Sequence, residues 1–447
     1  MNRKLLIAGT SSRSGKTTVT CALLAALRHR GFSLSAYKTG PDYIDTEYLR
    51  RSGKCRAFNL DTWLMSKESV QKLFALTSSG NDFSVIEGAM GLYDGGTQST
   101  AETAKLIDAP VVLVVNAKSS GESIAATVLG FREYDTNVKI AGVILNMTGS
   151  DYHAEIIADA LRAKGIKFLG ALRRDDEAFI PERHLGLVSA FENDNFDAEK
   201  LRVKFESSVD VDELLRIAED TNAVAGDSQQ KIFPSTKKFN VKIAVAGDEA
   251  FVFRYEESMM MLKAWGAEII PFSPLNDVEL PTADGYIFGG GYPEIFADRL
   301  AANSTMLRSV KDCRKPMLAE CGGMMYLCRS LRNIDGVKFK MTGVIPFDAF
   351  MGKRSVLGYM EATALRDNLL CRKGERIRGH EFHYAGIEPE VPTENTAFRM
   401  IRRNRNETRL SGYVQGNLLA SWLHLNFFGN EKITRNFLNV LTSSRVQ

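Results

Sequence analysis

A glycine-rich turn between a short apolar run and a helical pattern constrains the fold of this chain more than any other feature. The apolar run is Lys4–Ala8, the turn with its flanks is Gly9-Thr10-Ser11-Ser12-Arg13-Ser14-Gly15-Lys16-Thr17-Thr18, and helical spacing continues to Arg30. A strand, such a turn and a helix, in this order, are typical of a phosphate-binding loop (P-loop). Thr10 stands where the usual motif has its first glycine, and an ordinary Gly/Ser turn is the alternative. A partition-type ATPase would carry a Lys where this chain has Ser11.

The residue types of this loop suit a bound triphosphate. Backbone N–H groups at the helix start would hold phosphate oxygens, helped by the helix dipole. Lys16 would reach the β- and γ-phosphates, and the Thr17 hydroxyl would hold Mg²⁺. The loop residues that we expect at the nucleotide are Thr10, Gly15, Lys16, Thr17 and Thr18.

Two further segments place charged side chains near such a loop. Lys38–Asp45 combines a cation and two carboxylates around a Gly-Pro turn, and Val85–Gly95 ends a strand at Glu87. Glu87 is therefore expected at the carboxyl edge of a parallel sheet, where ligands bind in open α/β folds. Carboxylates near a triphosphate are natural Mg²⁺ ligands, whereas solvated acids in a turn are the alternative.

The order of strand-like and helix-like segments predicts two α/β domains. Apolar runs at Phe83–Ile86, Val111–Val115 and Val143–Leu145 alternate with helical patterns, as in a parallel sheet. A second α/β pattern begins at Val241. We expect an ATP- and substrate-binding domain over 1–190, a connecting segment with a small polar linker over 191–239, and a second domain over 240–447. Predicted helices include Glu206–Asp220 and Met324–Leu331.

Composition excludes several functional classes. Lys plus Arg is 57 and Asp plus Glu is 54, which argues against a polybasic nucleic-acid binder. No apolar run approaches the roughly 18 residues of a transmembrane helix, so we expect no membrane partner. The six cysteines form no C-x-x-C pair, which favours reduced thiols in the cytoplasm.

The second domain contains a candidate nucleophile. Pro316–Gly323 is predicted to form a strand that ends in a sharp turn at Cys321, followed by a helix whose start lowers the thiol pKa. His424, after an apolar run, is the best candidate for the base. The glycine turn Gly289–Gly291 could supply an oxyanion hole through the N–H groups of Gly290 and Gly291. His380 and His383 form an H-x-x-H motif, for which a supporting β-strand is favoured over a metal site.

With these motifs, nearly the whole chain resembles the cobyrinic acid a,c-diamide synthases, glutamine-dependent amidases of corrinoid (cobalamin) biosynthesis. Lys38–Asp45 is the most specific segment, because cobyric acid synthases share the architecture but not this motif. The other matching segments are Gly9–Ser12, Glu87–Gly95, Pro181–Leu187, Gly289–Glu294, Glu320–Gly323, Gly379–Tyr384 and Ala420–Asn426.

The resemblance implies a dethiobiotin-synthetase-like P-loop domain fused to a class I glutamine amidotransferase domain of flavodoxin-like fold. ATP with Mg²⁺ would phosphorylate a cobyrinic acid carboxylate, and ammonia from L-glutamine would displace the phosphate. Cys321 would be the glutaminase nucleophile and His424 its base. Implied roles in the first domain are Lys16, Thr17 and Glu87 at ATP and Mg²⁺, Asn146 at adenine, and Lys38, Asp42, Tyr43, Asp45 and Asp94 at substrate and metal.

Several alternatives stay open at the level of sequence. A nickel-sirohydrochlorin a,c-diamide synthase of coenzyme F430 biosynthesis shares these motifs. A partition-type nucleotide switch would have no use for Cys321 or His424, and a synthetase that uses free ammonia would survive alkylation of Cys321. Asn426 stands where the family often has a second His and triad amidotransferases have Glu, which leaves the third member of the glutaminase site open. Assembly as a homodimer is also left open.

Overall fold

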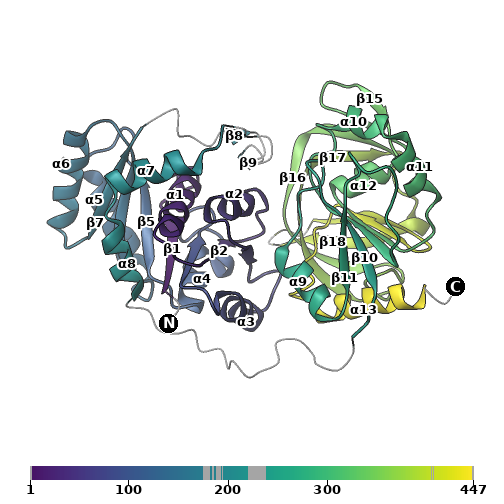
Figure 1. The fold of residues 1–447 in the computed structure, drawn as a ribbon, viewed down its shortest axis with the longest axis horizontal. Helices are drawn as coiled ribbons and strands as arrows, with labels where there is room; N and C mark the ends of the chain where they lie inside the picture. The colour runs from purple at the N-terminus through teal and green to yellow at the C-terminus, as the bar shows by residue number, and fades with distance from the viewer. Residues whose placement is uncertain are drawn as a thin grey trace. The chain divides into compact units, whose positions relative to one another are not determined.

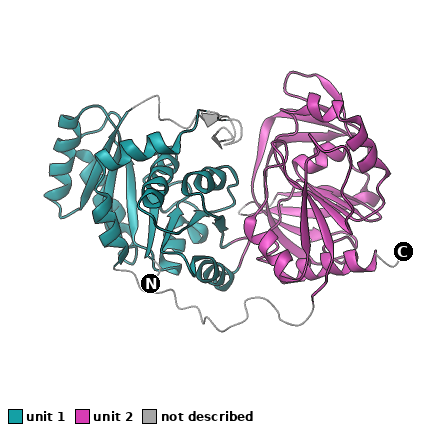
Figure 2. Cartoon of the chain, viewed as in Figure 1, with its two compact units in different colours: residues 1–62, 66–230 teal, residues 63–65, 231–447 magenta. Residues whose placement is uncertain are grey.

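The chain folds into two compact units, which are described separately below. The computed structural model describes residues 3–174, 182–183, 186–187, 193, 195–219, 238–403, 405 and 407–444. Unit 1 comprises 1–62 and 66–230, and unit 2 comprises 63–65 and 231–447 (Figure 2). The expected linker at 221–230 and most of the matching segment 181–187 lie outside the described residues.

Unit 1 contains a seven-stranded parallel sheet in the order β3-β2-β4-β1-β5-β6-β7 (Figure 1). Its strands are almost entirely buried, because helices cover a parallel sheet on both faces. The predicted parallel α/β domain is therefore confirmed. The strands are β1 (Arg3–Gly9), β2 (Leu34–Thr39), β3 (Ala57–Leu60), β4 (Phe83–Glu87), β5 (Val111–Asn116), β6 (Ile140–Thr148) and β7 (Phe168–Arg173), with a separate β8 (Glu182–Arg183) and β9 (Gly186–Leu187).

One face of this sheet packs against α1, α2, α7 and α8 in a single apolar core. The helix predicted over 206–220 is wrong, since two helices, α7 and α8, occupy this region. Val209 leaves α7 and bridges to Gly170, and Asp210 accepts a hydrogen bond from Glu213 N that starts α8. The helices are α1 (Lys16–His29), α2 (Ile44–Gly53), α3 (Lys67–Ser78), η1 (Gly96–Gln98), α4 (Thr100–Leu106), α5 (Ser123–Tyr134), α6 (Asp151–Arg162), α7 (Ala198–Ser208) and α8 (Val211–Glu219).

Unit 2 is built on five parallel strands in the order β11-β10-β12-β13-β20. When these five strands are numbered along the chain, their order in the sheet is 2-1-3-4-5, which is the order of flavodoxin-like sheets. The predicted fold class is confirmed. These strands are β10 (Lys242–Ala246), β11 (Glu268–Phe272), β12 (Gly285–Phe288), β13 (Met317–Glu320) and β20 (Leu418–Ser421), and the helices are α9 (Glu256–Ala264), α10 (Ala297–Ala302), α11 (Ser304–Asp312), α12 (Gly322–Leu327), η3 (Thr393–Asn395) and α13 (Glu431–Ser443).

A largely antiparallel region continues this sheet beyond β20, through β19, β18 and β16, with β17 paired to β16. The two long strands β16 and β17 pair along most of their length and bring His380 opposite Tyr359. The added strands are β14 (Ser330–Arg332), β15 (Lys338–Lys340), β16 (Asp348–Ala364), β17 (Arg376–Glu388), β18 (Thr396–Arg402) and β19 (Thr408–Gln415).

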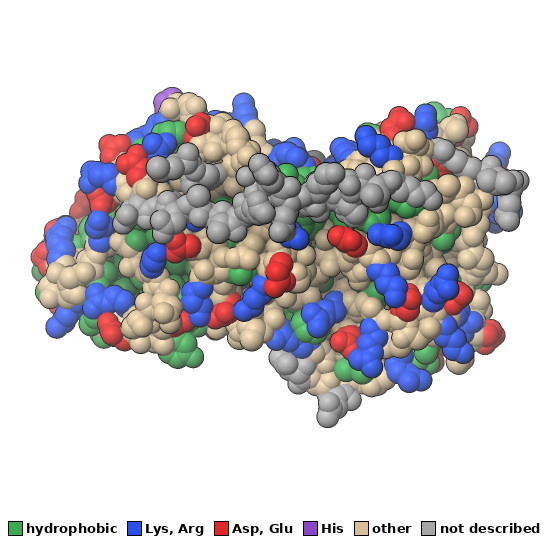
Figure 3. All heavy atoms as spheres, turned by 90° about the horizontal axis from the view of Figure 1, so that it is seen from below, with side chains coloured by type: hydrophobic (Ala, Val, Ile, Leu, Met, Phe, Trp, Pro, Cys, Tyr) green, Lys and Arg blue, Asp and Glu red, His purple; other side chains and the backbone are tan. Residues whose placement is uncertain are grey.

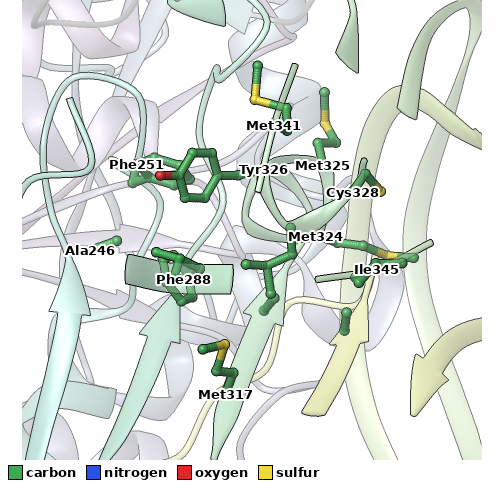
Figure 4. Close-up of a cluster of buried hydrophobic side chains, with 14 of the residues drawn as sticks. Ala246, Phe251, Phe288, Met317, Met324, Met325, Tyr326, Cys328, Met341 and Ile345 are labelled. Atoms are coloured by element: carbon green, nitrogen blue, oxygen red, sulfur yellow. The ribbon is translucent and has the colours of Figure 1, made fainter. Parts of the chain in front are cut away.

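The core of unit 2 lies around α12, where Phe288, Met324 and Tyr326 pack together (Figure 4). The predicted helix over 324–331 is too long, because α12 ends at Leu327. Arg329 N then donates to Phe347 O, and the following residues join the sheet as β14.

Acidic and basic side chains are interspersed on the face drawn in Figure 3, in keeping with the near balance of charge. Within the described ranges, no helix has the length and apolar character needed to cross a membrane.

Candidate active sites

The P-loop of unit 1 joins the end of β1 to the start of α1. Gly15 has φ 92°, a left-handed conformation that favours glycine, and a Cβ added there would lie 2.0 Å from Asn146 Nδ2. Asn146 Nδ2 donates to Ser14 O at 3.0 Å, and Lys16 Nζ donates to Ser11 O at 3.1 Å. Asn146 of β6 therefore holds the P-loop in place, and the Lys16 side chain folds back along the loop.

Four side chains form a buried cluster where β1, β2 and β4 end. Lys38 and Glu87 face each other in the register of neighbouring strands β2 and β4. Lys38 Nζ lies 2.8 Å from Glu87 Oε1 and 2.6 Å from Asp45 Oδ2, and Thr17 Oγ1 donates to Glu87 Oε1 at 2.6 Å. The sequence separates these residues widely, but the parallel sheet brings them together beside the P-loop.

The cluster suits a magnesium ion that is shared with phosphates. Glu87 is fully buried, and its Oε2 has no hydrogen-bond partner among the described residues. An orphaned carboxylate oxygen beside the Thr17 hydroxyl fits a cation that keeps water and phosphate among its ligands. The described residues contain no group of three or more His, Cys, Asp and Glu that could hold a metal by itself.

Burial and mutual charge perturb the titration of this cluster. Burial raises the pKa of Glu87 to about 7, although the Lys38 ammonium opposes the shift. Burial alone would lower the pKa of Lys38, but the carboxylates of Asp45 and Glu87 raise it. Burial and the neighbouring Lys38 lower the pKa of Lys16 to about 8. Perturbed groups of this kind gather at functional sites.

The remaining predicted residues of unit 1 support turns around the cluster. Asp42 Oδ1 accepts hydrogen bonds from Ile44 N and Asp45 N at 2.9 Å, and burial raises the Asp42 pKa to about 6. Tyr43, partly buried, precedes α2. Asp94 Oδ2 accepts from Gly91 N at 2.8 Å and steadies the loop after β4. The contacts of Asp42, Tyr43 and Asp94 with substrate stay predictions. The contact of Asn146 with adenine also stays a prediction.

In unit 2, Cys321 occupies a strained elbow between β13 and α12. Its backbone has φ 49° and ψ −106°, outside the conformations that non-glycine residues usually adopt. The following glycines permit this turn: a Cβ on Gly323 would lie 2.1 Å from Phe288 O, and one on Gly322 would lie 3.0 Å from Gly291 N. The predicted elbow is present.

The glycine turn after β12 brings the elbow and His424 together. Gly291 N lies close to Gly322, while a Cβ on Gly290 would lie 2.6 Å from His424 Cε1. The main chain of His424 pairs with that of His380 in both directions, at 2.8 and 3.1 Å. Cys321, the imidazole and the candidate oxyanion donors therefore lie around the same glycine turn, although they come from three separate parts of the sequence.

The expected lowering of the Cys321 pKa is wrong for this state of the molecule. Burial raises the pKa of the thiol to about 12, and the charge of Glu294 adds to the shift. The Gly322 N–H opposes this, but α12 is only six residues long. The thiol is thus protonated at rest, and a base is needed to activate it.

The side chain of Asn426, which the sequence leaves open as the third member of this site, bonds to other residues than the imidazole. Asn426 Nδ2 donates to Glu257 Oε1 at 2.8 Å, and its Oδ1 accepts from Gly429 N at 3.0 Å. The carboxylate close to the imidazole is instead that of Glu320, which sequence reasoning missed as a site residue of its own. In the sequence, its position directly before the candidate nucleophile Cys321 was the signal that could have indicated Glu320 as a site residue.

His380 and His383 lie on strand β17, as favoured from the sequence. The His383 ring stacks on Trp422 with centroids 4.4 Å apart, and its Nδ1 lies 2.8 Å from Ala385 O. Burial lowers the pKa of His380 to about 3 and that of His383 to about 4. Both histidines are therefore neutral, and they lie in the buried surroundings of His424.

Comparisons with known proteins match both units. Residues 5–188 match the family model described as a CobQ/CobB/MinD/ParA nucleotide binding domain, and residues 242–432 match a CobB/CobQ-like glutamine amidotransferase domain. The cobyrinate a,c-diamide synthase of Caldanaerobacter subterraneus subsp. tengcongensis is 41% identical over 99% of both chains. The proteins of the same name from Dehalococcoides mccartyi (strain CBDB1) and Picrophilus torridus are 40% and 38% identical, over 98% and 97% of this chain and 98% of each of theirs.

The fold and the paired domains define a carbon–nitrogen ligase with a nucleotide-binding domain and a glutamine amidotransferase domain. The first family model is named for MinD and ParA as well as for CobQ and CobB, whereas the second is named for CobB and CobQ alone. The chain belongs to the family of cobyrinate a,c-diamide synthases.

Proposed function

We propose that this enzyme amidates the a- and c-acetate carboxylates of cobyrinic acid, using ATP and ammonia released from L-glutamine. The observation that carries the proposal is that each unit holds the residues for one half of this reaction. Unit 1 has Lys16, Thr17 and Glu87 around a P-loop, and unit 2 has Cys321 and His424 beside a glycine turn. Relatives named cobyrinate a,c-diamide synthase that align along the whole chain support the choice of substrate.

In the glutaminase half, Cys321 Sγ attacks the side-chain amide carbon of glutamine while its proton passes to His424. The N–H groups of Gly290 and Gly291 stabilise the oxyanion. Collapse of the tetrahedral intermediate expels ammonia, which takes a proton from His424, and leaves a thioester on Cys321. Water then releases glutamate. Because the thiol is protonated at rest, proton transfer to His424 is the activating event.

In the synthetase half, a substrate carboxylate oxygen attacks the γ-phosphorus of ATP, and ADP leaves. Ammonia then attacks the acyl phosphate and displaces phosphate to form the amide. Lys16 and Lys38 stabilise the negative charge of the transferring group. Mg²⁺, when bound, would be held by Thr17 and Glu87 and would neutralise phosphate charge. Asp42, Tyr43, Asp45 and Asp94 position the substrate, and Asn146 contacts adenine.

Product analysis tests the proposal. The full-length protein is supplied with ATP, Mg²⁺ and glutamine, together with a panel of tetrapyrrole acids, and the products are weighed by mass spectrometry. Diamide formation from cobyrinic acid, dependent on ATP and glutamine, is the expected result. Diamide formation only from nickel-sirohydrochlorin would instead assign the enzyme to coenzyme F430 biosynthesis, and turnover of neither would overturn the proposal.

A further inference from the structure

The imidazole of a nucleophile–base pair works only in one tautomer, with its far nitrogen protonated and its near nitrogen free to accept the nucleophile's proton. A third group usually fixes that tautomer by accepting a hydrogen bond from the far nitrogen. For His424, the identity of this group rests on the proposed glutaminase role of Cys321.

Asn426, the candidate by sequence position, is occupied elsewhere. Its amide nitrogen donates to Glu257, and its amide oxygen accepts from Gly429 N. Both functional ends of the side chain are thus used in joining α9 to the segment that precedes α13. Asn426 is therefore a structural residue of this region.

We propose that Glu320 positions His424. Glu320 is the last residue of β13, directly before Cys321, and its Oε2 lies 3.8 Å from His424 Nδ1. Its other oxygen, Oε1, accepts from Leu425 N at 3.3 Å, so the carboxylate is held from the residue next to the histidine. Both side chains are buried, with 8% of Glu320 and 1% of His424 exposed. A single elbow thereby supplies the nucleophile and the group that orients its base.

The surroundings of His424 strengthen this assignment. Its ring is edged by Phe253, which is apolar, and lies near His380 and His383, which burial keeps neutral. Glu294 is the other carboxylate that acts on Cys321. In this low-dielectric setting the nearby Glu320 carboxylate favours the Nδ1–H tautomer of His424.

The distance of 3.8 Å is longer than a hydrogen bond. Catalytic hydrogen bonds are often long in the absence of substrate and tighten when substrate binds. The Leu425 N–H bond keeps the carboxylate beside the imidazole. Glu320 therefore acts through His424 as a positioning residue.

Substitution by Gln and by Ala separates this role from a structural one. Glu320→Gln retains the acceptor for Leu425 N but turns an N–H group toward His424 Nδ1, which selects the wrong tautomer. Glu320→Ala removes both. We expect kcat for glutamine hydrolysis to fall on the order of 10²-fold in each, with Gln no better than Ala, and KM to change little. Glu320→Asp should recover part of kcat, and ammonia-dependent synthesis should persist in all three.

Two comparisons make the result decisive. Glu257→Gln makes the same chemical change at another buried glutamate of unit 2 and should keep kcat near wild type. A Glu320→Gln variant with wild-type kcat, or one clearly more active than Glu320→Ala, overturns the proposal in favour of a structural role. If Cys321→Ser hydrolyses glutamine as fast as wild type, the proposed function fails instead, whatever the result at Glu320.

Discussion

Lys38 holds together the charged cluster of unit 1, because its ammonium group contacts both Asp45 and Glu87. These carboxylates neutralise a cation that would otherwise be costly to bury. In the proposed mechanism, the phosphates of ATP would compete for the same ammonium group. Glu87 is already bonded to the Thr17 hydroxyl as well as to Lys38.

Asp45→Asn should lower synthesis with either nitrogen source by up to about 10²-fold, because it frees Lys38 from one of its two carboxylate contacts. The fold should survive, since Lys38 keeps its contact with Glu87. Steady-state synthesis with ammonia as donor measures the effect. Glu47→Gln is the matched control, because it removes a carboxylate from the same helix that pairs with Arg50 instead. Wild-type rates for Asp45→Asn would show that Asp45 only shapes the turn.

Glu87→Gln should abolish synthesis and should also remove one source of pH dependence from the stability of the protein. The pKa of Glu87 is raised from 4.5 to about 7, so the folded protein binds this proton more tightly than the unfolded chain. The stability of the wild-type protein, compared with that of Glu87→Gln, should therefore fall as pH rises from the unfolded to the folded pKa of Glu87. Thermal unfolding of both proteins at about pH 5 and pH 8 measures the difference. The opposite trend would mean that the Lys38 contact dominates and the carboxylate is preferentially charged when folded.

At the scale of elements, helix α2 supplies Asp45 to the charged cluster of unit 1. Asp42 caps the start of this helix. Asp42 Oδ1 accepts from the N–H groups of Ile44 and Asp45, so the cap also fixes the residue that contacts Lys38. Asp42→Ala should cost about 1 kcal/mol of stability, whereas Asp42→Asn, which keeps the acceptor, should cost little. Urea unfolding checks both. If Asp42 serves only as a cap, Asp42→Asn also keeps wild-type synthesis, and a loss there would support a contact with substrate.

Elements with a strong local pattern could be predicted from the sequence, and those that depend on distant pairing could not. Buried strands such as Val111–Val115 and the turns at Gly15 and Cys321 carry their signal within a few residues. The long strand β16 does not, because its middle residues are exposed and it is stabilised by pairing with β17. Glu320 was missed for a similar reason: its significance depends on His424, which only the sheet of unit 2 brings near it.

At the scale of the whole molecule, each compact unit carries one half of the proposed chemistry. Lys16 and the charged cluster lie in unit 1, whereas Cys321, His424 and the glycine turn lie in unit 2. Ammonia is the one reactant that both halves share. Supplying ammonia from solution should therefore bypass unit 2 but never unit 1.

A pair of variants tests this division. Cys321→Ser should abolish synthesis from glutamine and spare synthesis from high ammonia, because the thiol serves only to release ammonia. Lys16→Ala should lower synthesis from both donors on the order of 10²–10³-fold, because both need the activated carboxylate. Cys313→Ser, at a partly buried cysteine of unit 2 outside the elbow, is the matched control and should change neither. Each variant is assayed with glutamine and with ammonia as the donor. Ammonia-dependent synthesis at the wild-type rate in Lys16→Ala would show that Lys16 does not act at the γ-phosphate. Glutamine-dependent synthesis in Cys321→Ser would show that the Cys321 thiol is not needed for the release of ammonia.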